Sequence, residues 1–153
     1  MLLVLVAAAP AGCAAYQPPS IRLADVRLAE RSDEAASFSF ELVVENPNED
    51  PIELREIRYT LALDGTTIYH GRRAALTTLH AGTSSVIVLP AVVRYDRAGW
   101  TADALPPQAE YELAGGMVYV TPGALAEMLL DTGVRTPTAS FRQAGSLSFA
   151  GGP

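Results

Sequence analysis

The sequence predicts an all-β protein, a seven-stranded antiparallel β-sandwich with one or two short helices. Apolar and polar residues alternate with a period of two over most of the chain after Ser20, which is typical of strands with one buried face. Clusters of turn-forming residues separate these runs at regular intervals. Of the 153 residues, 49% are hydrophobic, which is enough for the core of a single domain.

The strongest strand prediction is the segment 36–46, whose large apolar residues fall on one face of an extended chain. Those residues are Phe38, Phe40, Leu42 and Val44. The segment 53–63 repeats the pattern with Ile57, Tyr59, Leu61 and Leu63. All seven strands are expected at 21–29, 36–46, 53–63, 67–75, 83–94, 109–120 and 138–149.

Turn-forming residues are densest between residues 46 and 51, in the sequence Asn-Pro-Asn-Glu-Asp-Pro. Asn46 is expected to form an Asx turn as its strand ends, Pro47 to fix φ, and Asn48 to tolerate a left-handed backbone. The pair Asp64-Gly65 predicts a two-residue hairpin, because a type I′ turn needs positive φ at both central positions. We interpret all five residues as structural.

Two short helices are expected between strands. Thr121-Pro122 offers a capping residue followed by proline at the first helical position, and a helix over 122–132 would end at Gly133. A second candidate runs from Arg97 to Leu105, although Gly99 lowers its helix propensity.

Charge and cysteine content narrow the classes of partner. The formal net charge of −6 argues against nucleic acid, because an acidic domain repels phosphate backbones. The single cysteine, Cys13, excludes an intrachain disulfide and a cysteine-rich metal site.

The first nineteen residues are interpreted as an export and anchoring segment. The apolar run from Met1 to Ala9 is too short to cross a bilayer and has the length of a signal-peptide core. The stretch Pro10-Ala11-Gly12-Cys13 resembles the bacterial lipobox, in which the cysteine thiol receives diacylglycerol. The expected divisions are a lipoprotein signal peptide over 1–12, a lipid-anchored tether over 13–19 and a folded domain over 20–150. The alternative is simple secretion, with cleavage after Ala9-Pro10-Ala11.

A membrane, reached through lipid on Cys13, is therefore an expected partner. Stable attachment takes at least two acyl chains, and mature bacterial lipoproteins carry two or three. An Asp after the cysteine commonly retains lipoproteins in the inner membrane of Gram-negative bacteria, so Ala14 favours the periplasmic face of the outer membrane. A tether from Ala14 to Pro19 would extend roughly 20 Å at about 3.1 Å per residue.

No residue pattern predicts catalysis. The two histidines, His70 and His80, lack ligand-like spacing and are interpreted as exposed or edge residues. Carboxylates gather at Asp33-Glu34 and between Glu49 and Glu53. A hydrolase pair or a calcium site there is the alternative to solvated loop charges, which we favour. The sequence thus predicts no catalytic residue, no metal and no cofactor.

Strand edges and sheet faces are the expected openings for a protein partner. An unpaired edge can accept an added strand, although Arg72-Arg73 could block such pairing. Trp100 is expected to fill one end of the core, and an exposed patch of Trp100 with Tyr95 and Leu105 is the alternative.

From Phe38 onward the order of features resembles the late embryogenesis abundant group 2 family, whose domain is also called WHy, for water stress and hypersensitive response. The first matching block is Phe38-x-Phe40-x-Leu42-x-Val44-x-Asn46-Pro47-Asn48, then Pro51-Ile52. The second is Ile57-x-Tyr59-x-Leu61-x-Leu63-Asp64-Gly65, then Ile68-x-x-Gly71, and the third is Gly82 with Val86 to Pro90. The resemblance covers about residues 20–149.

What the resemblance implies is a sandwich of the immunoglobulin or fibronectin III kind with a link to desiccation and other stresses. The expected function is that of a non-catalytic envelope lipoprotein that binds or stabilises envelope components or client proteins. The alternative is a structural or accessory subunit of an envelope or transport complex. The first predicts protection of a labile protein during drying, and the second a stoichiometric partner without protection.

Overall fold

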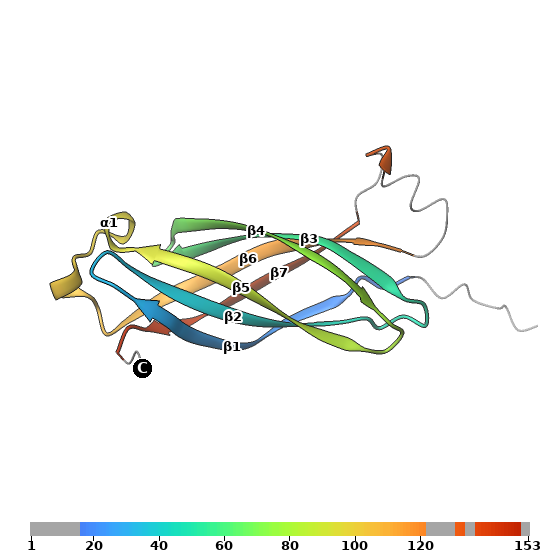
Figure 1. The fold of residues 1–153 in the computed structure, drawn as a ribbon, viewed down its shortest axis with the longest axis horizontal. Helices are drawn as coiled ribbons and strands as arrows, with labels where there is room; N and C mark the ends of the chain where they lie inside the picture. Colours follow the sequence, from blue (N-terminus) through green and yellow to red (C-terminus); the bar gives the residue numbers. More distant parts are fainter. Residues whose placement is uncertain (1–15, 122–130, 134–136, 151–153) are drawn as a thin grey trace, which may run out of the picture.

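The computed structural model describes residues 16–121, 131–133 and 137–150. These residues form seven strands in two antiparallel sheets, which confirms the predicted sandwich (Figure 1). The strands are β1 (Ser20–Arg31), β2 (Ala35–Glu45), β3 (Ile52–Leu63), β4 (Thr66–Leu79), β5 (Ser84–Arg94), β6 (Gln108–Val120) and β7 (Thr138–Ser148).

The strands are divided three and four between the sheets, in the orders β1-β2-β5 and β4-β3-β6-β7. Consecutive strands pair within a sheet as β1–β2, β3–β4 and β6–β7, and the chain changes sheet after β2, β4 and β5. The edge strands β4 and β5 lie beside each other along one side of the sandwich, and β1 and β7 lie beside each other along the other. We call the contact between β4 and β5 the β4–β5 seam.

The core lies between the sheets and is filled by alternate side chains of the central strands. In β2 every second residue from Ala36 to Val44 is buried, as the alternation predicts. The ring of Phe40 meets the ring of Tyr111 from the opposite sheet edge to face, with centroids 5.4 Å apart. Each large apolar side chain buried in this way contributes about 1.5–3 kcal/mol.

The strands run along the length of the molecule, so its loops gather at two ends (Figure 1). The near end contains the loops 46–51 and 80–83, the end of β6 and the start of β7, and the described chain begins there at Tyr16. The far end contains the hairpin 64–65 and the connection between β5 and β6.

The predicted helix from Arg97 to Leu105 is wrong. The connection contains a single helical turn, α1 (Tyr95–Ala98), and a separate 3-10 turn, η1 (Ala102–Ala104). Gly99 ends α1 in a left-handed conformation with φ of 74°. Trp100 then turns inward and meets Phe149 edge to face at 5.3 Å, so it fills the far end of the core and is not part of an exposed aromatic patch.

Most of the predicted helix over 122–132 lies outside the described residues. Among the residues that the structure describes, we find no helix of the length and apolar character needed to span a membrane.

Candidate functional site

The side chain of Asn46 joins the loops of the near end. It is completely buried and follows the last residue of β2. Its Nδ2 donates to the backbone carbonyl oxygens of Asp50 at 2.8 Å and Leu79 at 3.1 Å, and its Oδ1 accepts from the backbone N–H of Asn48 at 3.1 Å, which makes an Asx turn around the exposed Pro47. Because both atoms of the amide are engaged, Asn46 acts as a structural link.

Asn48 binds the N-terminal segment Tyr16–Pro19 to the near end. Its Nδ2 donates to the backbone carbonyl of Gln17 at 2.8 Å, and its Oδ1 accepts from the backbone N–H of Gln17 at 2.9 Å. We call this reciprocal pair the Asn48 clamp. Pro19 is buried, so the last four residues of the expected tether lie against the domain. Cys13 lies outside the described residues.

Tyr16 completes the attachment of this segment. Its ring stacks on that of Tyr119, with centroids 6.4 Å apart and an angle of 17° between the planes. The Tyr16 hydroxyl is buried and has no hydrogen-bond partner within the described part of the chain. Burial, together with the neighbouring Tyr119 and Asp50, raises the pKa of Tyr16 to about 12.

At the far end, Asp64 and Gly65 connect β3 to β4. Their φ angles are 46° and 82°, and Leu63 and Thr66 on either side are register partners. Positive φ at both positions is the geometry of a type I′ hairpin turn. These two residues set the register of the β3–β4 pair and lie far from the near-end loops (Figure 1).

The β4–β5 seam is closed by a tyrosine that crosses an edge strand. Tyr59 on β3 extends over Gly71 on β4 and donates its hydroxyl hydrogen to the backbone carbonyl of Pro90 on β5. A Cβ atom at residue 71 would lie 2.1 Å from Cζ of Tyr59, so only glycine leaves room for this ring. Burial raises the pKa of Tyr59, which keeps the hydroxyl a donor.

Arg73 covers a second carbonyl at the same seam, since its Nη1 donates to the backbone oxygen of Val88. Because β5 is an edge of the three-stranded sheet, carbonyls that point away from β2 would otherwise be available to an added strand. Pro90 also lacks an N–H donor. Tyr59 and Arg73 therefore cover backbone carbonyls at the β5 edge, whereas Arg72 pairs with Glu56 on the outer sheet face.

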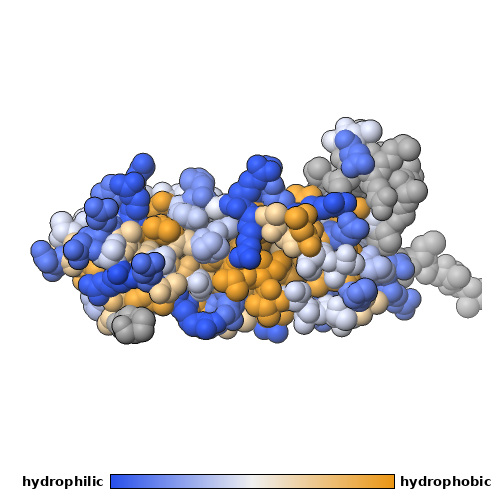
Figure 2. All heavy atoms as spheres, viewed as in Figure 1, coloured by the Kyte–Doolittle hydropathy of each residue, from blue (hydrophilic) through white to orange (hydrophobic). Residues whose placement is uncertain are grey.

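The outer face of the three-stranded sheet carries exposed valines. Val86 and Val92 on β5 have 57% and 37% of their surface exposed, and Val88 between them is half-buried. Val43 on β2 is the register partner of Val86, which places the two side chains next to each other on this face. We call Val43, Val86, Val88 and Val92 the valine stripe. Figure 2 shows hydrophobic side chains gathered near the middle of the molecule.

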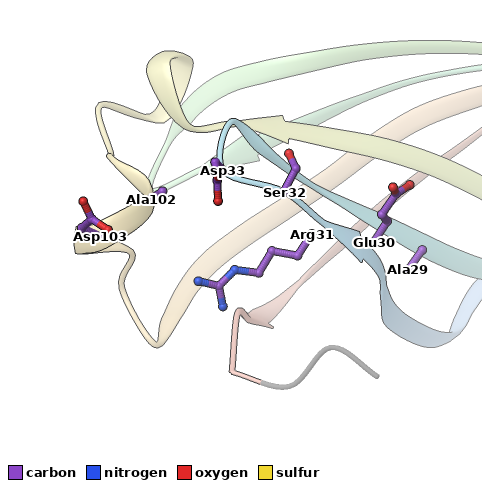
Figure 3. Close-up of a pocket in the computed structure, with 7 residues that line it drawn as sticks. All are labelled: Ala29, Glu30, Arg31, Ser32, Asp33, Ala102 and Asp103. Carbon is purple, nitrogen blue, oxygen red and sulfur yellow. The ribbon is translucent and has the colours of Figure 1, made fainter.

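A surface hollow at the far end has a volume of about 620 Å³ (Figure 3). It is lined by Asp33 from the β1–β2 turn, Asp103 from η1 and Arg31 from the end of β1. Arg31 is held by a 3.1 Å hydrogen bond from Nη1 to the backbone carbonyl of Phe149. No cluster of three or more histidine, cysteine or carboxylate side chains suited to a metal occurs among residues 16–121, 131–133 and 137–150.

The two histidines lie on different parts of the molecule and share no site. His80 is exposed in the near-end loop, and His70 is exposed on β4. His70 lines a shallow hollow with Arg58 and Arg72 on the outer face of the four-stranded sheet. Burial alone would raise the pKa of Glu56, but hydrogen bonds from both arginines hold it below its ordinary value. Glu56 and the two arginines thus form an ion-pair network on the outer face of this sheet.

Sequence reasoning missed the Asn48 clamp, the closed β4–β5 seam and the valine stripe. The stripe did leave a signal, because residues 86–93 read Val-Ile-Val-Leu-Pro-Ala-Val-Val without polar alternation. Such a run in a strand with only one face in the core leaves apolar side chains outside. The clamp and the seam join residues more than ten positions apart and left no local signal.

Comparison with solved structures places the same fold in other organisms. A protein from Archaeoglobus fulgidus is 12% identical, with a TM-score of 0.53 over 83% of this chain and 97% of the other. A protein from Arabidopsis thaliana is 20% identical, with a TM-score of 0.60 over 83% of this chain and 79% of the other. A third structure, assigned to the late embryogenesis abundant (LEA) proteins, is 18% identical, with a TM-score of 0.60 over 86% of this chain and 71% of the other.

The search of curated proteins finds no match. The family described as late embryogenesis abundant protein matches residues 41–144, which include Asn46, Asn48, the 64–65 hairpin and the whole of β3, β4, β5 and β6. That span is more than half of the 153 residues. The chain therefore belongs to the late embryogenesis abundant family, as the strand and turn pattern predicted.

Proposed function

We propose that this protein is a non-catalytic envelope lipoprotein with a WHy-type domain, which protects client proteins during water loss by contacting them with the outer face of its three-stranded sheet. Membership of a stress- and desiccation-related family supports the link to water loss. The valine stripe is the observation that carries the mode of action, because apolar side chains on a rigid face can cover apolar segments that a drying client exposes.

The contacts at the β5 edge favour the outer face of the three-stranded sheet as the surface that meets clients. At the β5 edge, Tyr59 and Arg73 occupy carbonyl oxygens, and Pro90 provides no N–H. Strand addition at that edge would have to break these contacts first. The valines need no such rearrangement, since Val86 and Val92 already project into solvent.

The test is protection of a labile reporter enzyme during drying or freezing, using the purified domain without lipid. We expect the double variant Val86→Thr/Val92→Thr to lose most of the protection, because threonine keeps the shape and β-propensity of valine but replaces a methyl group with a hydroxyl. The matched control is Val118→Thr, on the outer face of the other sheet. Equal protection by the wild-type domain and both variants would show that the valine stripe is not the surface that contacts clients.

Anchoring is the second part of the proposal. The lipobox-like residues before Cys13 support lipidation there, and Ala14 supports the periplasmic face of an outer membrane. Mass spectrometry of the intact protein from membrane fractions should find a chain that starts at Cys13 and carries acyl mass. An unmodified chain cleaved after Ala11 would instead indicate simple secretion.

The competing function is that of an accessory subunit of an envelope or transport complex. It predicts a stoichiometric partner in detergent extracts and no protection of the reporter enzyme. Arg58 and Arg72 with Glu56 form a charged network that a partner could contact on the four-stranded sheet.

A further inference from the structure

The Asn48 clamp shortens the segment that connects the folded domain to its proposed anchor at Cys13. Both of its hydrogen bonds run between the Asn48 side chain and backbone atoms of Gln17. The buried ring of Pro19 and the stack of Tyr16 on Tyr119 hold the same segment. The chain is thus attached to the domain from Tyr16 onward, four residues earlier than the first strand begins.

Covalent geometry then limits the distance to Cys13. Three residue steps separate Cys13 from Tyr16, and each spans at most about 3.6 Å, so the Cα atoms of the two residues lie within about 11 Å. If the segment Tyr16–Pro19 were released, four further steps would add up to roughly 14 Å. The attachment of Tyr16–Pro19, to which the clamp contributes, therefore decides how far the domain can move from its anchor.

We propose that the near end of the sandwich is a membrane-facing surface, kept next to the lipid headgroups by the Asn48 clamp. This inference rests on the proposed lipidation of Cys13. β2 is eleven residues long, so at about 3.4 Å per residue the far end can stand up to roughly 37 Å further from the bilayer than the near end. The outer faces of both sheets, including the valine stripe, then extend away from the membrane and stay accessible.

The charge of the near end fits contact with headgroups without insertion. Glu45, Glu49 and Asp50 are exposed there, and His80 is the one ionisable base in the loops 46–51 and 80–83. Carboxylates resist transfer into hydrocarbon and repel anionic headgroups. The charged side chains of these loops thus add little attraction to lipid, and in this proposal the covalent anchor holds the near end close to the membrane.

The chain offers a clean way to measure this arrangement. Acylation converts the only native thiol, that of Cys13, to a thioether, so one introduced cysteine can be labelled alone. We would reconstitute the lipidated protein in vesicles of phosphatidylcholine and phosphatidylglycerol, with an acceptor dye in the headgroups. Donor dyes would be placed at Glu49→Cys, at the near end, and at Asp103→Cys, at the far end.

We expect strong energy transfer from residue 49 and weak transfer from residue 103. Asn48→Ala should lower transfer from residue 49, because the released segment lengthens the tether. Gln17→Ala is the matched control and should leave transfer unchanged, because only backbone atoms of Gln17 form the clamp. Tyr16→Ala tests the same attachment through the stack on Tyr119, should Asn48→Ala disturb the fold by circular dichroism.

Two results would overturn the inference. One is equal energy transfer from the two labels. The other is unchanged transfer from residue 49 in a variant, Asn48→Ala or Tyr16→Ala, that still folds. Mass spectrometry of the same samples separates the two proposals. Acyl mass on Cys13 with equal transfers rejects the membrane-facing end alone, whereas missing acyl mass rejects the anchoring and with it this inference.

Discussion

At the scale of single residues, Gly71 shows how one missing side chain can permit a long-range contact. Its φ is outside the left-handed region, so the backbone does not require glycine. The ring of Tyr59 does, because it passes directly over the Cα of residue 71 on its way to the carbonyl of Pro90. The glycine of the family-like pattern Ile68-x-x-Gly71 thus has a packing explanation.

Substitution of Gly71 by alanine should test that explanation. We expect Gly71→Ala to lower the free energy of unfolding by about 2 kcal/mol or more, because a Cβ 2.1 Å from Cζ of Tyr59 must displace the ring. Chemical denaturation monitored by fluorescence provides the measurement. In a Tyr59→Ala background the same substitution should cost less than about 1 kcal/mol. An equal cost in both backgrounds would show that Tyr59 is not the cause.

For the loop 46–51, the sequence predicted the local turn geometry but not the long-range hydrogen bonds. An Asx turn at Asn46 involves Asn48, two residues away, and follows from known preferences of asparagine. The carbonyl of Leu79 that Asn46 also binds is 33 residues away, and the clamp between Asn48 and Gln17 spans 31. Contacts of that kind depend on how the two sheets pack, which no local pattern encodes.

At the scale of elements, most of the seven strands were predictable because the alternation of apolar and polar residues survives in them, whereas β5 is an apolar run bounded by turn residues. β4 shows where this fails, since it was expected over 67–75 and continues to Leu79. Leu76 interrupts the pattern with a φ of 32° and is 75% exposed, at an irregularity in the β3–β4 register. The helix predicted after β5 is wrong because Gly99 ends α1 in a left-handed conformation, after which Trp100 packs on Phe149.

The protection of the β5 edge gives an element-scale prediction. Arg73→Ala should speed aggregation during mild heating, because it uncovers the backbone carbonyl of Val88 on an edge strand. Arg72→Ala is the matched control, since Arg72 pairs with Glu56 on the outer sheet face and loses the same charge. Light scattering at a fixed temperature measures the rate. Equal acceleration in the two variants would point to lost charge and not to the exposed edge.

At the scale of the whole molecule, the fold is closed by contacts that lie outside the two hydrogen-bonded sheets. Tyr59 and Arg73 join the sheets along the β4–β5 seam, and Asn46 ties the near-end loops. The Asn48 clamp adds Tyr16–Pro19 to this body, although the sequence placed the start of the domain at residue 20. The Pro18-Pro19 pair favours an extended chain, and extended chain can lie on a surface as well as in solvent.

Two truncations should locate the true start of the folded unit. A chain beginning at Tyr16 should unfold at the same denaturant concentration as the mature chain beginning at Cys13, because every described contact of the segment is kept. A chain beginning at Ser20 should be less stable by about 1–3 kcal/mol, since it loses the hydrogen bonds to Asn48, the stack on Tyr119 and the burial of Pro19. If both truncations unfold together with the mature chain, residues 16–19 contribute nothing to the fold, and the domain can move on a tether of full length.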